Sequence, residues 1–200
     1  MAAAPQVAGT AALPPAVEAV GRHAEDAYDV AKAGTWTTAR VIVDSLKRAV
    51  STLPAAAQSA VAPSGALHAE VATLDQAVTD RNHVRAERAA NHITALGAQM
   101  AAQYLAPVPA NVVLLDYYGR ELEIWSTAND RTKLRDTALA MSRTWGAVRP
   151  QVIARGGNAE ATRFDALVSR AEGASTVAAY ARLATPVLDE VDRLEAVFTR

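Results

Sequence analysis

The chain has 200 residues, of which half are hydrophobic and a fifth are charged, and its formal net charge is −1. This length and balance suit one folded domain with a sizeable core and exclude a wholly disordered chain. The near-neutral charge and the lack of any run of Lys and Arg exclude a general nucleic-acid binder. No apolar stretch reaches the roughly 18 residues that a membrane-spanning helix needs, so we expect no membrane insertion.

The N-terminal segment, residues 1–15, is rich in alanine and proline and has no helical periodicity. We therefore predict a disordered or extended arm there. Such a segment is typical of the stretch that follows a removed signal peptide, which favours a periplasmic or secreted protein. A cytoplasmic protein with a frayed N-terminus is the alternative. The sequence contains no cysteine, which fits either compartment and excludes disulfides, thiolate metal sites and cysteine nucleophiles.

Helical periodicity accounts for the rest of the chain, and alanine, the strongest helix former, is its most frequent residue. The pattern predicts four long helices over residues 16–53, 65–105, 110–155 and 158–200. The apolar register shifts at Gly34, where the helix either has a kink or bulge or is an ordinary long helix with a small drift. It shifts again near Asn129, where the third helix either bends or is split. Pro186 predicts a kink in the fourth helix or the start of a separate last helix.

No segment alternates apolar and polar residues between turn signals, so we predict no strand. Four long helices joined by short connections must alternate in direction. The predicted fold class is therefore all-α, an antiparallel up-down-up-down four-helix bundle with long helices. We expect residues 16–200 to form this single helical-bundle domain.

Catalytic and metal-binding motifs are sparse in this sequence. The G-x-S-x-G nucleophile motif and the glycine-rich phosphate loops are both missing, so we expect a binding protein rather than an enzyme. The short His/carboxylate groupings are Asp80 with His83 and His23 with Asp26. Solvated polar residues explain both, so we predict no metal site and no cofactor. A metal-binding bundle for iron or copper remains the alternative.

The strongest candidate site is a polar layer between the second and third predicted helices. Its centre is the segment Asn111–Trp125, in which apolar and charged residues each recur at helical spacing. Charged side chains that turn inward must be paired or bind a ligand, because an isolated buried charge is very costly. The candidate ligand-binding residues are Asn82, Arg85, His92, Asp116, Tyr117, Arg120 and Glu123. A buried layer of ion pairs that fixes the helix register is the structural alternative, as is an outward-facing charged stripe on the third helix.

The predicted architecture resembles bacterial cell-envelope bundles, among them imelysin-like iron-uptake proteins and cytochrome c′-like proteins. The His-x-x-Glu motif of the first is absent, and the Cys-x-x-Cys-His motif of the second is excluded without cysteine. No residue role is carried over from either family. We predict an exported helical protein that binds a small polar or anionic ligand, or a protein partner in the envelope. A purely structural or interaction protein is the third possibility.

Overall fold

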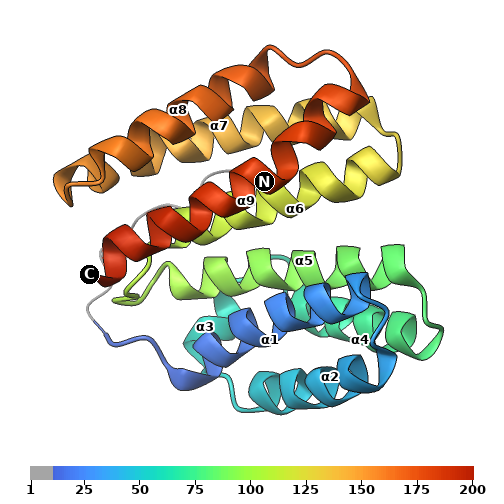
Figure 1. Ribbon diagram of the computed structural model, residues 1–200. Coiled ribbons are helices and arrows are strands. Elements are labelled where there is room, and N and C mark those ends of the chain that lie inside the picture. Colours follow the sequence, from blue (N-terminus) through green and yellow to red (C-terminus); the bar gives the residue numbers. More distant parts are fainter. Residues whose placement is uncertain (1–10) are drawn as a thin grey trace. The chain divides into compact units, whose positions relative to one another are not determined.

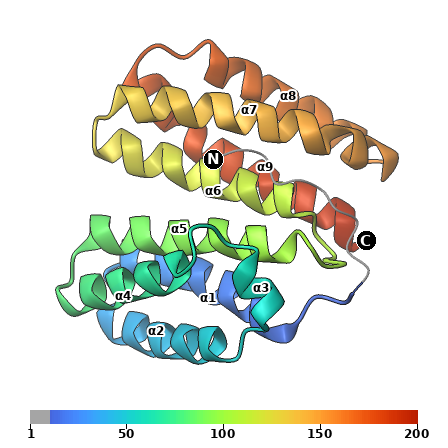
Figure 2. The ribbon, with the colours of Figure 1, turned by 180° about the vertical axis from the view of Figure 1, so that it is seen from behind.

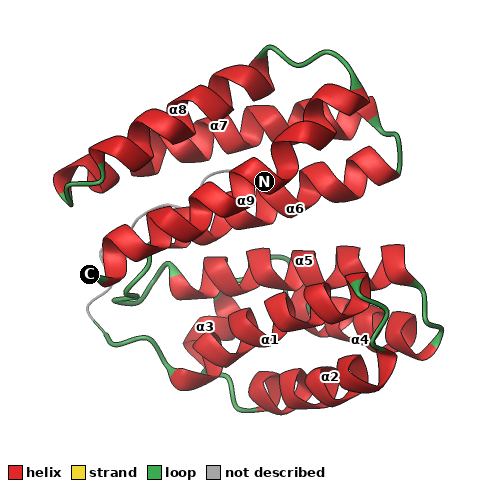
Figure 3. Ribbon diagram, in the orientation of Figure 1, coloured by secondary structure: helices red, strands yellow, loops and turns green. Residues whose placement is uncertain are grey.

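The computed structural model describes residues 11–200, and every regular element in this range is an α-helix (Figures 1 and 3). The nine helices of this range are α1 (Pro15–Lys32), α2 (Trp36–Ser51), α3 (Ala55–Ser59), α4 (Ala66–Thr79), α5 (His83–Ala101), α6 (Ala110–Thr127), α7 (Arg131–Ala154), α8 (Asn158–Glu172) and α9 (Val177–Thr199). The all-α prediction is confirmed. Most of the predicted N-terminal arm lies outside the described residues.

Each of the four predicted long helices is interrupted by a short turn. The turns span residues 33–35, 80–82, 128–130 and 173–176. The kink or drift predicted at Gly34 is a complete break between α1 and α2, and the alternative of a split near Asn129 is the correct one. The last predicted helix breaks before Thr176, whereas α9 runs through Pro186 without interruption. The prediction of four long helices is therefore wrong.

The same helix-ending motif closes α1, α4, α6 and α7. In each, one residue turns into the left-handed region: Gly34, Arg81, Asn129 and Gly156 have φ values of 71°, 53°, 55° and 82°. The next residue then donates its N–H to the carbonyl five residues back, as Asn82 does to Ala77 at 2.9 Å. This pair of features is the Schellman motif, which satisfies carbonyls at a helix end.

Side-chain caps start the next helix after three of the four turns at residues 33–35, 80–82, 128–130 and 173–176. The Asn82 side chain accepts a hydrogen bond from the Arg85 backbone N–H at 3.0 Å, and Asp130 and Thr176 cap α7 and α9 in the same way. A cap of this kind satisfies one of the unpaired N–H groups of the first helical turn. Asn82 therefore interrupts the apolar pattern of the sequence because it begins a helix.

The described chain divides into two compact units, an N-terminal unit that ends at Ala106 and a C-terminal unit that begins at Pro107. This division differs from the single domain predicted over residues 16–200. In the N-terminal unit, α1 and α4 each pack against both α2 and α5, which closes a ring of four helices (Figures 1 and 2). In the C-terminal unit, α6 and α8 each pack against both α7 and α9.

The core of the N-terminal unit contains small side chains at the contact between α1 and α5. A Cβ atom placed on Gly97 would lie 3.4 Å from the Cα atom of Gly21, so the two backbones approach closely. Ala24 of α1 and Ala90 of α5 are also buried. The chain ends of the unit also meet, because the Leu105 N–H donates to the Ala11 carbonyl at 2.8 Å.

Candidate functional site

Three of the seven predicted site residues line one groove on the N-terminal unit, between α4 and α5. The groove has a volume of about 680 Å³. Its lining consists of Glu70, Thr73, Asn82, Val84, Arg85, Arg88, Ala89 and His92. The structure thus brings Asn82, Arg85 and His92 together. The expectation that Asn82 and Arg85 point into the helical interior is wrong, because both are exposed at the start of α5.

Arg85 is the groove residue whose charge is most available to a ligand. Within residues 11–200 its guanidinium takes part in no hydrogen bond or ion pair. It lies in the first turn of α5, which contains no acidic residue, and there the positive end of the helix dipole adds to the charge of the side chain. This end of the groove is therefore cationic.

The far end of the groove is held by a polar contact between the two helices. The Nδ1 atom of His92 on α5 lies 3.2 Å from Oε1 of Glu70 on α4, and both side chains are partly exposed. Thr73 lies one turn further along α4 and adds a hydroxyl group, while Val84 and Ala89 add apolar surface. The groove can therefore offer an anion a cationic end, further hydrogen-bonding groups and a small apolar contact.

The other four predicted residues all lie on α6, in the C-terminal unit. Asp116 and Arg120 form the predicted i,i+4 ion pair, with Oδ2 and Nε 3.2 Å apart and side chains only 14% and 10% exposed. Tyr117 is buried and packs edge-on against Tyr118, and Glu123 is partly buried. Because Arg120 and Tyr117 are buried, the alternative of a simple solvent-facing stripe does not describe this helix.

Sequence reasoning missed Glu195 of α9, which lies near the Asp116–Arg120 pair. The pKa of the Glu195 carboxyl is raised from its usual 4.5 to about 7, and burial is the largest cause. The negative charges of Asp116 and Asp192 contribute to this rise, and the positive charge of Arg120 partly opposes it. Nearly 80 residues separate Glu195 from Asp116, about the combined length of three helices and their turns, so no local spacing could have indicated this contact.

Glu195 makes stability depend on pH in a defined window. As pH rises from about 4.5 to about 7, the unfolded chain releases the Glu195 proton before the folded protein does. The folded state binds more protons in this window, so the contribution of Glu195 to the free energy of unfolding falls as pH rises. We expect Glu195→Gln to melt at a higher temperature than wild type near pH 8. Near pH 4 the two proteins should differ little, and thermal melts at both pH values check this.

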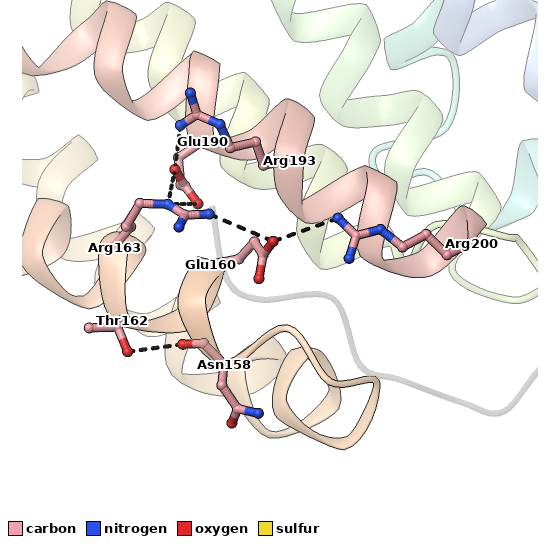
Figure 4. Close-up of polar contacts among 7 residues, drawn as sticks. All are labelled: Asn158, Glu160, Thr162, Arg163, Glu190, Arg193 and Arg200. Atoms are coloured by element: carbon pink, nitrogen blue, oxygen red, sulfur yellow. Dashed lines mark hydrogen bonds and ion pairs between the residues drawn. The ribbon is translucent and has the colours of Figure 1, made fainter.

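A second group that sequence reasoning missed is an ion-pair network between α8 and α9 (Figure 4). Glu190 of α9 is only 2% exposed, yet it accepts hydrogen bonds from Arg163 Nε at 2.9 and 3.0 Å and from Arg193 Nη1 at 2.7 Å. Glu160 of α8 lies 3.6 Å from Arg163 Nη2 and 3.7 Å from Arg200 Nη2. The Glu160–Arg163 and Glu190–Arg193 pairs share the i,i+3 spacing, the one local signal in the sequence.

The His/carboxylate groupings of the sequence do not converge on a metal-ligand set. Within residues 11–200 there is no group of three or more His, Asp or Glu side chains that could hold a metal ion. His83 Nδ1 lies 2.7 Å from the carbonyl oxygen of Ala31, and Asp80 accepts a hydrogen bond from Gln76. His23 Nδ1 lies 3.9 Å from Oδ2 of Asp26.

In the described part of the chain, no helix has the length and apolar character needed to cross a membrane.

A scan against protein-family models found no match for this chain, and searches of curated proteins and of solved structures found none either.

Proposed function

We propose that the protein binds a small anionic ligand in the groove between α4 and α5. The observation that carries this proposal is the exposed Arg85 guanidinium, which has no partner within residues 11–200 and lines a groove of about 680 Å³. A guanidinium presents a planar set of N–H donors that matches a carboxylate or phosphate group. Ligand pockets for small molecules are commonly of this volume.

The remaining groove residues suit the same kind of ligand. Arg88 lines the groove one turn beyond Arg85 and adds a second positive charge, while His92 and Glu70 provide polar contacts. Val84 and Ala89 supply apolar surface for a short hydrocarbon portion. We infer a small organic acid or phosphate ester rather than a polymer, because the volume of the groove, about 680 Å³, matches a ligand of this size.

We propose that this binding activity belongs to an exported protein, in the periplasm or outside the cell, and the alanine- and proline-rich composition of residues 1–15 supports this location. The polar α6 residues Asp116, Tyr117, Arg120 and Glu123 belong to the C-terminal unit, and for them we propose a stabilising role through the Asp116–Arg120 pair. A metal-binding function has less support, because residues 11–200 offer no convergent ligand group.

Replacement of Arg85 tests the proposed function. We expect Arg85→Met to weaken binding of a carboxylate or phosphate by about tenfold or more, since a hydrogen bond to a charged group contributes about 1.5–3 kcal/mol. Stability should change by no more than about 0.5 kcal/mol, because the side chain is exposed. A thermal-shift screen of organic acids and phosphate esters identifies the ligand, and titration calorimetry then measures its affinity.

The matched control is Arg40→Met, which removes another exposed arginine of the same unit, on α2 and outside the groove. This variant should bind like wild type. If no anion raises the melting temperature of the wild-type protein in a concentration-dependent manner, the proposed function is wrong. Equal weakening in both variants would show that binding follows overall charge and does not use the groove.

A further inference from the structure

The last helix, α9, carries its charges on two different flanks. Glu190, Arg193 and Arg200 follow one another at intervals of three and seven residues. Glu190 and Arg200 contact the α8 side chains Arg163 and Glu160, and Arg193 contacts Glu190. Asp192 and Glu195 lie on the other flank, where Glu195 is close to Asp116 of α6. The basic side chains therefore lie together along the junction of α9 with α8.

Three arginines along this junction are held in place by two carboxylates. Glu190 is shared by Arg163 and Arg193, and Glu160 is shared by Arg163 and Arg200 (Figure 4). Each guanidinium has five N–H donors, and one carboxylate can engage only part of that set. The three side chains remain 45%, 56% and 67% exposed, so donors are left facing solvent. Contact with the buried Glu190 orients two of these guanidiniums before any partner binds.

The network also carries excess positive charge. Its three arginine side chains face two glutamate carboxylates, so these five side chains sum to one positive charge. A further guanidinium, that of Arg155, follows α7 and contacts Phe198 of α9. Arg155 Nη1 donates to the Phe198 carbonyl at 3.3 Å, and its guanidinium lies over the Phe198 ring. We call Arg163, Arg193 and Arg200 the arginine row.

We propose that the arginine row is a docking surface for an acidic segment of a protein partner. An acidic segment complements the charge of the row, because the row is positive and its guanidinium N–H donors suit carboxylate groups. Arg193 and Arg200 are two helical turns apart, about 10 Å along α9. An extended polyproline-II segment repeats every three residues, at about 9 Å, and so presents carboxylates at a matching interval.

A nucleic acid fits the arginine row less well. Glu160 and Glu190 interrupt the row, and a continuous series of phosphates would meet their negative charges. A segment with separated carboxylates can instead bind the arginines and leave space beside each glutamate. The contacts are exposed, so the interaction is expected to weaken steeply with added salt.

The test measures binding of the full-length protein to a fluorescent oligoglutamate peptide by anisotropy at low salt. We expect Arg200→Gln and Arg193→Gln each to weaken binding about fivefold. Arg200→Gln is the safer variant, because Glu190 keeps both of its arginine partners. The matched control is Arg182→Gln, which removes an exposed arginine of α9 that lies outside the row and donates to the Ala178 carbonyl. Circular dichroism confirms that each variant is folded.

Three results would overturn the proposal. Wild-type protein that binds oligoglutamate no better than oligolysine has no acidic-segment site. A loss in Arg182→Gln equal to that in Arg200→Gln would show a diffuse charge effect. Inorganic phosphate can be added while the total ionic strength is held constant. If it then displaces the peptide completely, the site binds a single oxyanion and not an acidic segment. Binding that is weakened about fivefold in both row variants, unchanged in Arg182→Gln and resistant to phosphate supports the docking surface.

Discussion

Replacing Phe164 by alanine is expected to lower the free energy of unfolding by about 3–5 kcal/mol, the usual cost of removing a fully buried aromatic ring. Phe164 of α8 is 0% exposed, and its ring centroid lies 4.6 Å from that of Trp145 on α7. Trp145 in turn donates its indole N–H to Asp165 at 2.7 Å, and Asp165 also accepts hydrogen bonds from Arg149. Loss of the phenyl ring leaves a cavity at the point where this cluster joins the two helices.

Urea denaturation followed by circular dichroism measures the effect. Phe164→Leu fills most of the same space and is expected to cost less than about 1.5 kcal/mol. Val41→Ala, at a residue 61% exposed on α2, should change stability by no more than about 0.5 kcal/mol. A Phe164→Ala variant as stable as Val41→Ala would contradict the packing of α8 against α7.

Gly119→Val is expected to destabilise the protein by about 1–3 kcal/mol through overpacking of the contact between α6 and α9. A Cβ atom on Gly119 would lie 2.6 Å from Cδ2 and 2.9 Å from Cγ of Leu188. It would also lie 3.3 Å from Cγ1 of the buried Val187. Both α9 residues must move to admit even one added carbon, and the branched side chain of valine adds two more.

Gly146 provides the matched control, since it lies within α7 and an added Cβ atom there would meet nothing within 4 Å. Gly146→Ala is expected to stabilise the protein by about 0.5–1 kcal/mol, because alanine has the higher helix propensity. The two glycines thus predict changes of opposite sign in the same urea experiment. A stabilising substitution at Gly119 would show that α6 and α9 are not in close contact there.

The sequence was sufficient to predict the helices but not the points at which they end. The apolar periodicity of the sequence continues across a turn of three residues with little change. Two helices joined by such a turn therefore give the same sequence pattern as one long helix. Gly34 and Asn129 gave a visible signal, because both residue types tolerate the left-handed conformation. Arg81 gave none, because an arginine at φ 53° is held there by the surrounding structure and not by its own preference.

In the candidate site, too, a contact between residues close in the sequence could be predicted, whereas contacts between residues far apart in the sequence could not. The Asp116–Arg120 pair followed from i,i+4 spacing, and the structure contains it. The contact of Glu190 with Arg163 joins residues 27 positions apart, and its existence depends on how α8 and α9 pack. Helical spacing identified Asn82 and Arg85 as polar breaks in an apolar face, but only the turn before α5 explains why they lie at the surface.

The hydrogen bond from Leu105 to Ala11 has a consequence for the way this chain can be rearranged. Because the first and last segments of the N-terminal unit are adjacent, a short linker could join them without disturbing α1 or α5. The chain could then be opened elsewhere, for instance in the exposed connection around Ser64, to give a circular permutant with the same helical contacts. A unit whose ends meet is also easily inserted into a loop of another protein or repeated in tandem.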